Sequence, residues 1–149
     1  MGCGSKNKSC NQKSCQRYYN NKAQAFTAAG SVQLDIAGSR VVDTGVSIET
    51  NPQSYEIVKP GLYHISADAV VNATTAGDID FSVFMDGVEL PCTFKVATLA
   101  AGYTPVHTET DLVINGCCGV NRSITFVVKS VSVAVGSVTQ FCSGITKLA

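Results

Sequence analysis

Short stretches in which apolar and polar residues alternate run through most of the chain, and they constrain its fold more than any other feature. The clearest is GLYHISADAVV at residues 61–71, where Tyr63, Ile65 and Ala67 alternate with His64, Ser66 and Asp68. A period of two residues places one face of a β-strand on a core and the other in solvent. No segment of 10 or more residues has the 3.6-residue period of a helix. The spacing predicts about eight to ten short strands, and therefore an all-β sandwich or jelly roll.

Three further segments repeat this pattern. SVQLDI at residues 31–36 alternates, and DIDFSVFMDG at 78–87 places Ile79, Phe81 and Val83 on one face before an Asp-Gly pair. Asp-Gly between two β-rich runs is a strong signal for a tight hairpin. VHTETDLVI at 106–114 places His107, Glu109, Asp111 and Val113 on one face, opposite Thr108, Thr110, Leu112 and Ile114. These segments belong to one domain, because 149 residues bury a single full-sized core.

The first 22 residues differ from the rest of the chain, being polar, rich in Asn and Lys, and without periodicity. They contain no acidic residue, and their basic residues are Lys6, Lys8, Lys13, Arg17 and Lys22. The rest of the chain carries all eleven acidic residues against six basic ones, so this arm is about +5 and the body about −5. Opposite charges predict that the arm of one copy docks on the body of another. A solubilising tail or a weak nucleic-acid contact is the alternative.

The sequence thus predicts a connector arm at residues 1–22 and a β-domain at 23–149. No apolar run reaches the roughly 20 residues of a membrane span. The N-terminus also lacks the apolar segment of a secretion signal. We therefore expect assembly in the cytoplasm, with another copy of the chain as the partner and with neither a membrane nor nucleic acid as one.

One stretch carries a resemblance to a known family. YEIVKPGLYHISADAVV, in which Pro60-Gly61 precedes the alternating strand from Tyr63, resembles the strand entry of tumour necrosis factor (TNF) and complement globular-head jelly rolls. The hairpin FSVFMDGVEL and the terminal ITKL also resemble elements of that family, so that the resemblance spans residues 24–149. It implies a TNF-like jelly-roll β-sandwich, here with an extended N-terminal arm, that assembles as a homotrimer. No Gly-X-Y stalk precedes the body, and the thiol-rich arm occupies its place.

Candidate catalytic residues are scarce. The two histidines, His64 and His107, fall on the outward faces of their predicted strands, and the chain has no Gly-x-Ser-x-Gly, His-x-x-Glu-His or phosphate-loop motif. We expect no enzyme and no cofactor. Asp78 and Asp80 share a strand face and are weak calcium candidates, although such a pair is more often a solvated surface.

Seven cysteines, an odd number, cannot all pair within one chain. The spacings Cys3-x₆-Cys10 and Cys10-x₄-Cys15, and the adjacent Cys117-Cys118, fit a zinc site poorly. A myristoyl anchor is disfavoured because Lys6 stands where that signal has Ser or Thr. Cross-linking between subunits remains. The candidates on the arm and the loops are Cys3, Cys10, Cys15, Cys117 and Cys118, with Cys92 next.

These features predict a non-enzymatic structural subunit that self-assembles into a disulfide-cross-linked surface fibre. In architecture the chain resembles the endospore appendage subunits of Gram-positive bacteria, which implies assembly in the mother cell, a final place on the spore surface, and an anchoring or tip protein as a further candidate partner. Two alternatives stay open. One is a phage virion protein, such as a head decoration or a fibre or tail-tip trimer, and the other is a soluble receptor-binding head.

Overall fold

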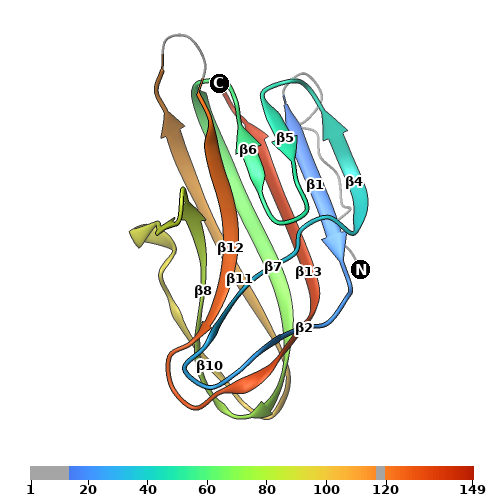
Figure 1. Cartoon of the computed structure of the whole chain (residues 1–149), viewed down its shortest axis with the longest axis vertical. Coiled ribbons are helices and arrows are strands. Elements are labelled where there is room, and N and C mark those ends of the chain that lie inside the picture. Colours follow the sequence, from blue (N-terminus) through green and yellow to red (C-terminus); the bar gives the residue numbers. More distant parts are fainter. Residues whose placement is uncertain (1–13, 117–119) are drawn as a thin grey trace.

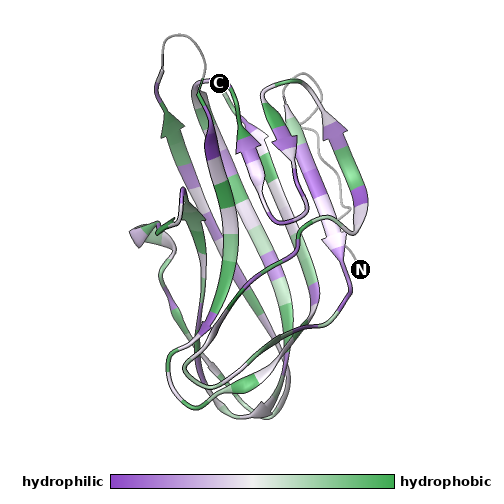
Figure 2. Cartoon of the chain, viewed as in Figure 1, coloured by the Kyte–Doolittle hydropathy of each residue, from purple (hydrophilic) through white to green (hydrophobic). Residues whose placement is uncertain are grey.

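The chain folds into two antiparallel β-sheets packed face to face, as the alternating sequence predicts (Figure 1). The computed structural model describes residues 14–116 and 120–149. Figure 2 shows hydrophobic and hydrophilic residues alternating along the strands. The strands, in chain order, are β1 (Cys15–Asn20), β2 (Gln24–Phe26), β3 (Ser31–Gln33), β4 (Ser39–Thr44), β5 (Ile48–Thr50), β6 (Tyr55–Ile57), β7 (Gly61–Thr75), β8 (Gly77–Met85), β9 (Val88–Glu89), β10 (Val96–Leu99), β11 (Gly102–Ile114), β12 (Arg122–Ser130) and β13 (Val135–Lys147).

Sheet A has the order β11-β7-β13-β1-β4, and β2 also pairs with β13. Sheet B has the order β10-β8-β12-β6-β5, with β3 on β12 and β9 on β8. The short 3₁₀ helix η2 (Pro91–Thr93) connects β9 to β10. Neighbouring strands are thus mostly distant in sequence, which is typical of a jelly roll and of a chain that must close long loops as it folds.

Aromatic side chains fill the centre of the space between the sheets. Phe126 of β12 lies 5.4 Å from Phe141 of β13, measured between ring centroids, and 6.2 Å from Tyr55 of β6. Phe81 of β8 contacts Phe141 at 6.3 Å, again edge to face. Because the rings come from both sheets, this cluster holds the two layers together.

The hairpin between β8 and β9 has the predicted turn. Asp86 and Gly87 both have positive φ angles, 52° and 82°, as a two-residue type I′ turn requires. The Asp86 carboxylate accepts hydrogen bonds from the Ser123 backbone N–H and from Arg122 Nη1, both at 2.9 Å. These donors lower the pKa of Asp86.

The first described strand, β1, begins at Cys15, before residue 23, where the sequence predicts the start of the domain. β1 pairs with β13 on one side and with β4 on the other. Its polar residues are buried but hydrogen-bonded: Gln16 Nε2 donates to Asp43 Oδ1 at 2.6 Å, and Asn20 Nδ2 donates to the Asp35 carbonyl at 3.1 Å. Because the buried side chains of β1 are polar, its sequence lacks the alternation of apolar and polar residues from which a strand is usually predicted. Ser14 is also buried and accepts a hydrogen bond from the Ser47 N–H, so the connector arm is at most residues 1–13, which lie outside the described residues.

Candidate functional site: the outer face of sheet A

Two neighbouring strands of sheet A place ionisable side chains on its outer face. β7 and β11 pair antiparallel, with His107 opposite Asp68, Glu109 opposite Ser66, and Asp111 opposite His64. Side chains two residues apart on a strand share a face. The register therefore gathers on one surface a histidine–carboxylate ladder, which we define as His64, Asp68, His107, Glu109 and Asp111.

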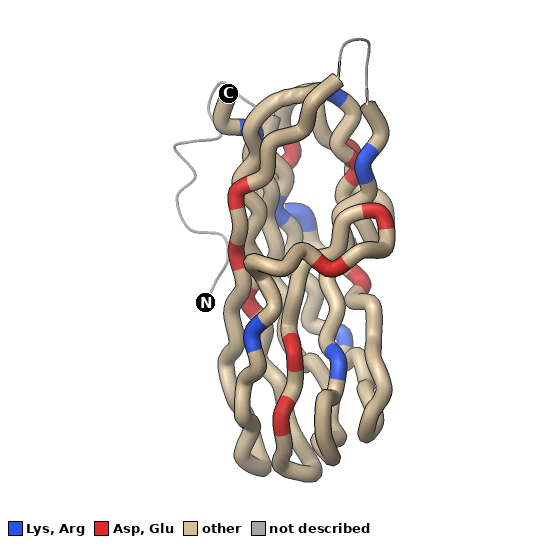
Figure 3. The backbone as a smooth tube through the Cα atoms, turned by 90° about the vertical axis from the view of Figure 1, so that its left-hand side faces the viewer, with Lys and Arg blue, Asp and Glu red and all other residues tan. Residues whose placement is uncertain are grey.

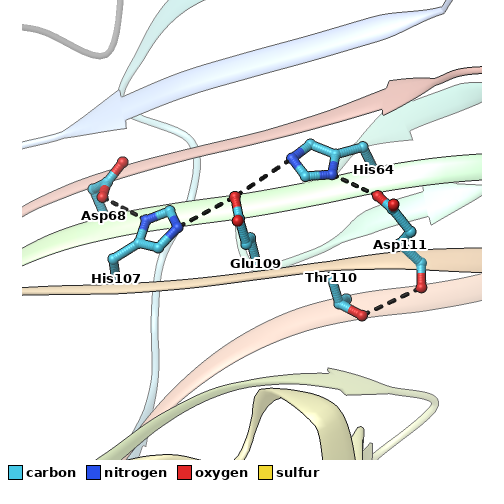
Figure 4. Close-up of polar contacts among 6 residues, drawn as sticks. All are labelled: His64, Asp68, His107, Glu109, Thr110 and Asp111. Atoms are coloured by element: carbon cyan, nitrogen blue, oxygen red, sulfur yellow. Dashed lines mark hydrogen bonds and ion pairs between the residues drawn. The ribbon is translucent and has the colours of Figure 1, made fainter.

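The ladder is continuous along the strands (Figure 4). His107 Nδ1 lies 2.7 Å from Asp68 Oδ1, and His64 Nδ1 lies 2.6 Å from Asp111 Oδ1. Glu109 stands between the two rings, with its Oε1 atom 3.3 Å from His107 Nε2 and 3.7 Å from His64 Nε2. Each imidazole thus has a carboxylate at both of its nitrogens.

The ladder is open to solvent, with side-chain exposures between 39% and 65%. Exposed ion pairs each contribute only about 0–1 kcal/mol to stability. The arrangement therefore suits recognition of a partner better than stabilisation of the fold.

Apolar side chains stand at both ends of the ladder on β11. Tyr103 is 72% exposed and Val113 is 63% exposed, and both share the outer face with His107 and Glu109. A polar strip between exposed apolar groups has the composition of a recognition surface. Among the described residues, the partners of the two histidines are carboxylates, and neither ring contacts a hydroxyl or thiol nucleophile of the kind that covalent catalysis needs.

The two histidines lie where the sequence predicts, on outward strand faces. Their carboxylate partners could have been found too, because an antiparallel pairing of residues 61–75 with 102–114 brings the two alternating patterns together. The missing information was the register, because a shift of two residues would keep both buried faces on the core and still change which outward side chains lie opposite each other.

The candidate cross-linking cysteines differ in their surroundings. Cys3, Cys10, Cys117 and Cys118 lie outside the described residues. Cys15 is fully buried in β1, with its Sγ atom 3.3 Å from Thr146 Oγ1, so it is part of the sheet and not of an arm. Cys92 is an exposed free thiol on η2, and its Sγ atom lies 3.0 Å from Thr110 Oγ1 of β11.

The basic residues of the arm are likewise divided. Lys6, Lys8 and Lys13 lie outside the described residues, Arg17 is on β1, and Lys22 is exposed just after it. The Arg17 side chain lies over Gly144 of β13. A Cβ atom at position 144 would be 2.9 Å from Arg17 Nη1, so the glycine leaves room for the guanidinium group. Charged positions in the described part of the chain are spread over the sandwich, as Figure 3 shows for one of its sides.

The two calcium candidates have separate partners. Asp78 accepts a hydrogen bond from Thr98 Oγ1 at 2.8 Å, whereas Asp80 is buried and accepts bonds from Ser82 Oγ and the Lys95 backbone N–H, both at 3.3 Å. Burial, together with the hydrogen bond and the charge of Glu89, raises the pKa of Asp80 to about 7. Asp80 therefore pairs with Glu89, which the sequence did not suggest. Within residues 14–116 and 120–149, no group of three or more His, Cys, Asp and Glu side chains is arranged to hold a metal ion.

Sheet order, core and outer face together define a TNF-like jelly roll. Murine APRIL at pH 8.0 is similar in structure, with a TM-score of 0.62, 13% sequence identity, and coverage of 92% of this chain and 100% of that chain. PRD1 vertex protein P5 is similar at a TM-score of 0.60 and 14% identity, over 92% of this chain and 98% of that chain. No protein-family profile and no curated protein sequence matches the chain.

In the described part of the chain, no helix is long and apolar enough to cross a membrane.

Proposed function

We propose that the protein is a non-enzymatic structural subunit that self-associates through the outer face of sheet A. The observation that carries this proposal is the ladder of β7 and β11 with Tyr103 and Val113 exposed at its ends. A homotrimer is the assembly that the TNF-like fold favours, since the resemblance found in the sequence implies three-fold heads.

The higher assembly is a surface fibre of the endospore-appendage type, with residues 1–13 as the connector to the next subunit. Disulfides from Cys3 or Cys10 to Cys117, Cys118 or Cys92 of a neighbour would make that contact covalent. Each bond joins two thiols, and their two electrons and two protons pass to molecular oxygen when the protein reaches an oxidising environment. Such a subunit is synthesised in the mother cell and ends on the spore surface.

A virion structural protein is the second candidate. It is favoured by the likeness to PRD1 vertex protein P5, a protein that its name places at a vertex. The two candidates differ in the shape of the assembly and in its dependence on thiols. Electron micrographs of the purified, air-oxidised protein distinguish them, because the first candidate gives fibres and the second gives separate particles.

The interface is tested by a matched pair of substitutions. Val113→Glu places a charge on the proposed interface, and Val88→Glu places one on β9, at a valine of similar exposure, 68%, in sheet B. Sedimentation should show that the first substitution dissociates the assembly at least tenfold more readily while the second leaves it unchanged. Equal effects of the two substitutions, or a monomeric native protein, would reject this face as the interface.

The covalent part is tested separately on denaturing gels. Without reductant, the air-oxidised protein should run as a ladder of multimers that reductant collapses to one band, and peptide mapping should find links between different chains. A single monomer band, or disulfides confined to one chain, would reject cross-linking and leave the non-covalent proposal to be judged by sedimentation.

A further inference from the structure

A second surface feature lies away from the outer face of sheet A. It is a groove of about 760 Å³ between the end of β1, the segments 33–38 and 51–54, and the outward side of β12. Its lining is dominated by side-chain amides and hydroxyls. We call it the amide groove, after the lining residues that matter here: Asn20, Gln33, Asp35, Asn51, Gln53 and Thr125.

Backbone hydrogen bonds fix the walls of the amide groove. The N–H groups of Ile36 and Ala37 both donate to the Pro52 carbonyl, at 2.7 and 3.2 Å, and so tie the two loop segments to each other. The Asn51 N–H donates to the Ser54 carbonyl at 2.8 Å, which closes the second loop into a turn. A ligand would therefore meet a preformed surface and would not have to order these loops.

The side chains in the groove are also held in fixed orientations. Gln53 Nε2 donates to Asp35 Oδ1 at 2.7 Å, and Gln33 Nε2 donates to Gln53 Oε1 at 3.4 Å. Asn20 Nδ2 donates to the Asp35 carbonyl at 3.1 Å. Each amide carries both a donor and an acceptor, and these contacts use only part of that capacity.

Several polar side chains of the lining have no hydrogen-bond partner within the described residues. Two of them are the amide of Asn51 and the hydroxyl of Thr125, which belong to the second loop and to β12 respectively. They offer donors and acceptors from two different segments of the same groove.

The composition of the lining narrows the class of ligand. Among the described lining residues Lys22 is the single base, so a phosphate or a nucleic acid would lack the basic cluster it needs. Asp35 is the single acid and already accepts from Gln53, which leaves no ligand set for a cation. Ala37 and Pro52 are the apolar residues of the lining, too few for an apolar ligand or for the side chains of a peptide.

We propose that the amide groove binds a neutral saccharide. Hydroxyl groups donate and accept at short intervals, which matches a preformed surface of amides and hydroxyls without net charge. The described lining has no aromatic ring for a sugar to stack on, so we expect weak single-site binding with a dissociation constant of about 1 mM. Several copies displayed together would raise the apparent affinity by about 10²–10⁴.

The test is saturation-transfer NMR on the full chain. The probes are neutral oligosaccharides of glucose, mannose and N-acetylglucosamine at about 10 mM, a sulfated oligosaccharide, and an uncharged Asn/Gln-rich peptide. At least one neutral oligosaccharide should give saturation transfer, and the double variant Asn51→Ala/Thr125→Val should reduce it at least tenfold. Gln140→Ala, which removes an exposed amide from β13, is the matched control and should leave it unchanged.

Three results would overturn the proposal. They are no binding of any neutral oligosaccharide, binding that the double variant leaves intact, and preferential binding of the sulfated probe or of the peptide. The assay does not depend on self-association, because a protein that stays monomeric can still be scored for sugar binding, and a failed sugar assay leaves the sedimentation result unaffected.

Discussion

Tyr55 of β6 and Ser143 of β13 join the two sheets through a buried hydrogen bond, with their hydroxyl oxygens 2.8 Å apart. Both residues are almost completely inaccessible to solvent, and the Tyr55 ring packs edge-on against Phe126. Burial raises the pKa of the Tyr55 phenol, which therefore stays protonated. This is a polar contact between the layers in an otherwise apolar region.

Removing one partner of this bond should cost more than removing both. Tyr55→Phe leaves the Ser143 hydroxyl buried and unpaired, so we expect a loss of about 1–3 kcal/mol in the free energy of unfolding. Ser143→Ala added to Tyr55→Phe should recover part of that loss, because no orphaned group remains. Urea unfolding of the two single variants and the double variant measures the coupling. Additive losses would mean that the two hydroxyls do not interact.

The aromatic cluster should dominate stability. Phe126→Ala removes a ring that contacts Tyr55 and Phe141 between the sheets, and it should lower the free energy of unfolding by about 3–5 kcal/mol. Phe94→Ala is the control, since that ring is half exposed, and it should change stability by no more than about 0.5 kcal/mol. Thermal or urea unfolding of both variants measures the two changes in the free energy of unfolding. Similar losses in the two variants would contradict the assigned core.

The Asp80–Glu89 pair should make stability depend on pH in an unusual direction. Asp80 holds its proton up to about pH 7 in the folded chain but only to about pH 4 when unfolded, so the folded state binds more protons between these values. The contribution of Asp80 to stability is therefore full below about pH 4 and is lost as the pH rises through 7.

Asp80→Asn tests this prediction, because the amide stays neutral at every pH. Unfolding measured at pH 5, 6.5 and 8 should show that this variant gains stability relative to the native chain as the pH rises. Asp78→Asn, two residues away on the same strand, should run parallel to the native chain. A constant difference between Asp80→Asn and the native chain would show that Asp80 does not titrate in this range.

Truncation distinguishes the arm from β1. Deleting residues 1–13 removes no described residue and should leave a folded chain. Deleting residues 1–20 also removes the strand between β13 and β4, together with the buried Gln16 and Asn20, and should unfold the chain or greatly destabilise it. Circular dichroism and sedimentation of both truncations provide the measurement. A stable fold without residues 14–20 would restore the domain boundary at residue 23.

The sequence predicts the parts of this fold in which hydrophobic burial decides the pattern. Residues 61–71 and 106–114 alternate because one face of each strand packs on the core, and both are strands as expected. The turn at Asp86-Gly87 is also predictable from the sequence, because few residue pairs accept two positive φ angles.

The parts that escape prediction depend on partners distant in the chain. β1 is buried by hydrogen bonds from Gln16 and Asn20 to residues about 15 to 30 positions away, and no local pattern encodes these. From the sequence alone Asp80 would be taken for a surface carboxylate. In the structure it is in contact with Glu89 and with the backbone N–H of Lys95. The amide groove is the extreme case, since its walls come from four separate segments.

β11 forms one border of sheet A among the described strands, and its residues resist the addition of another strand. Pro105 has no N–H to donate, and Glu109 and Asp111 bring charge to the same strand. At this border, copies of this chain would therefore meet as folded bodies and would not extend one sheet into the next. A fibre built in this way would lack the 4.7–4.8 Å axial repeat of cross-β material, and its dissociation would release folded subunits.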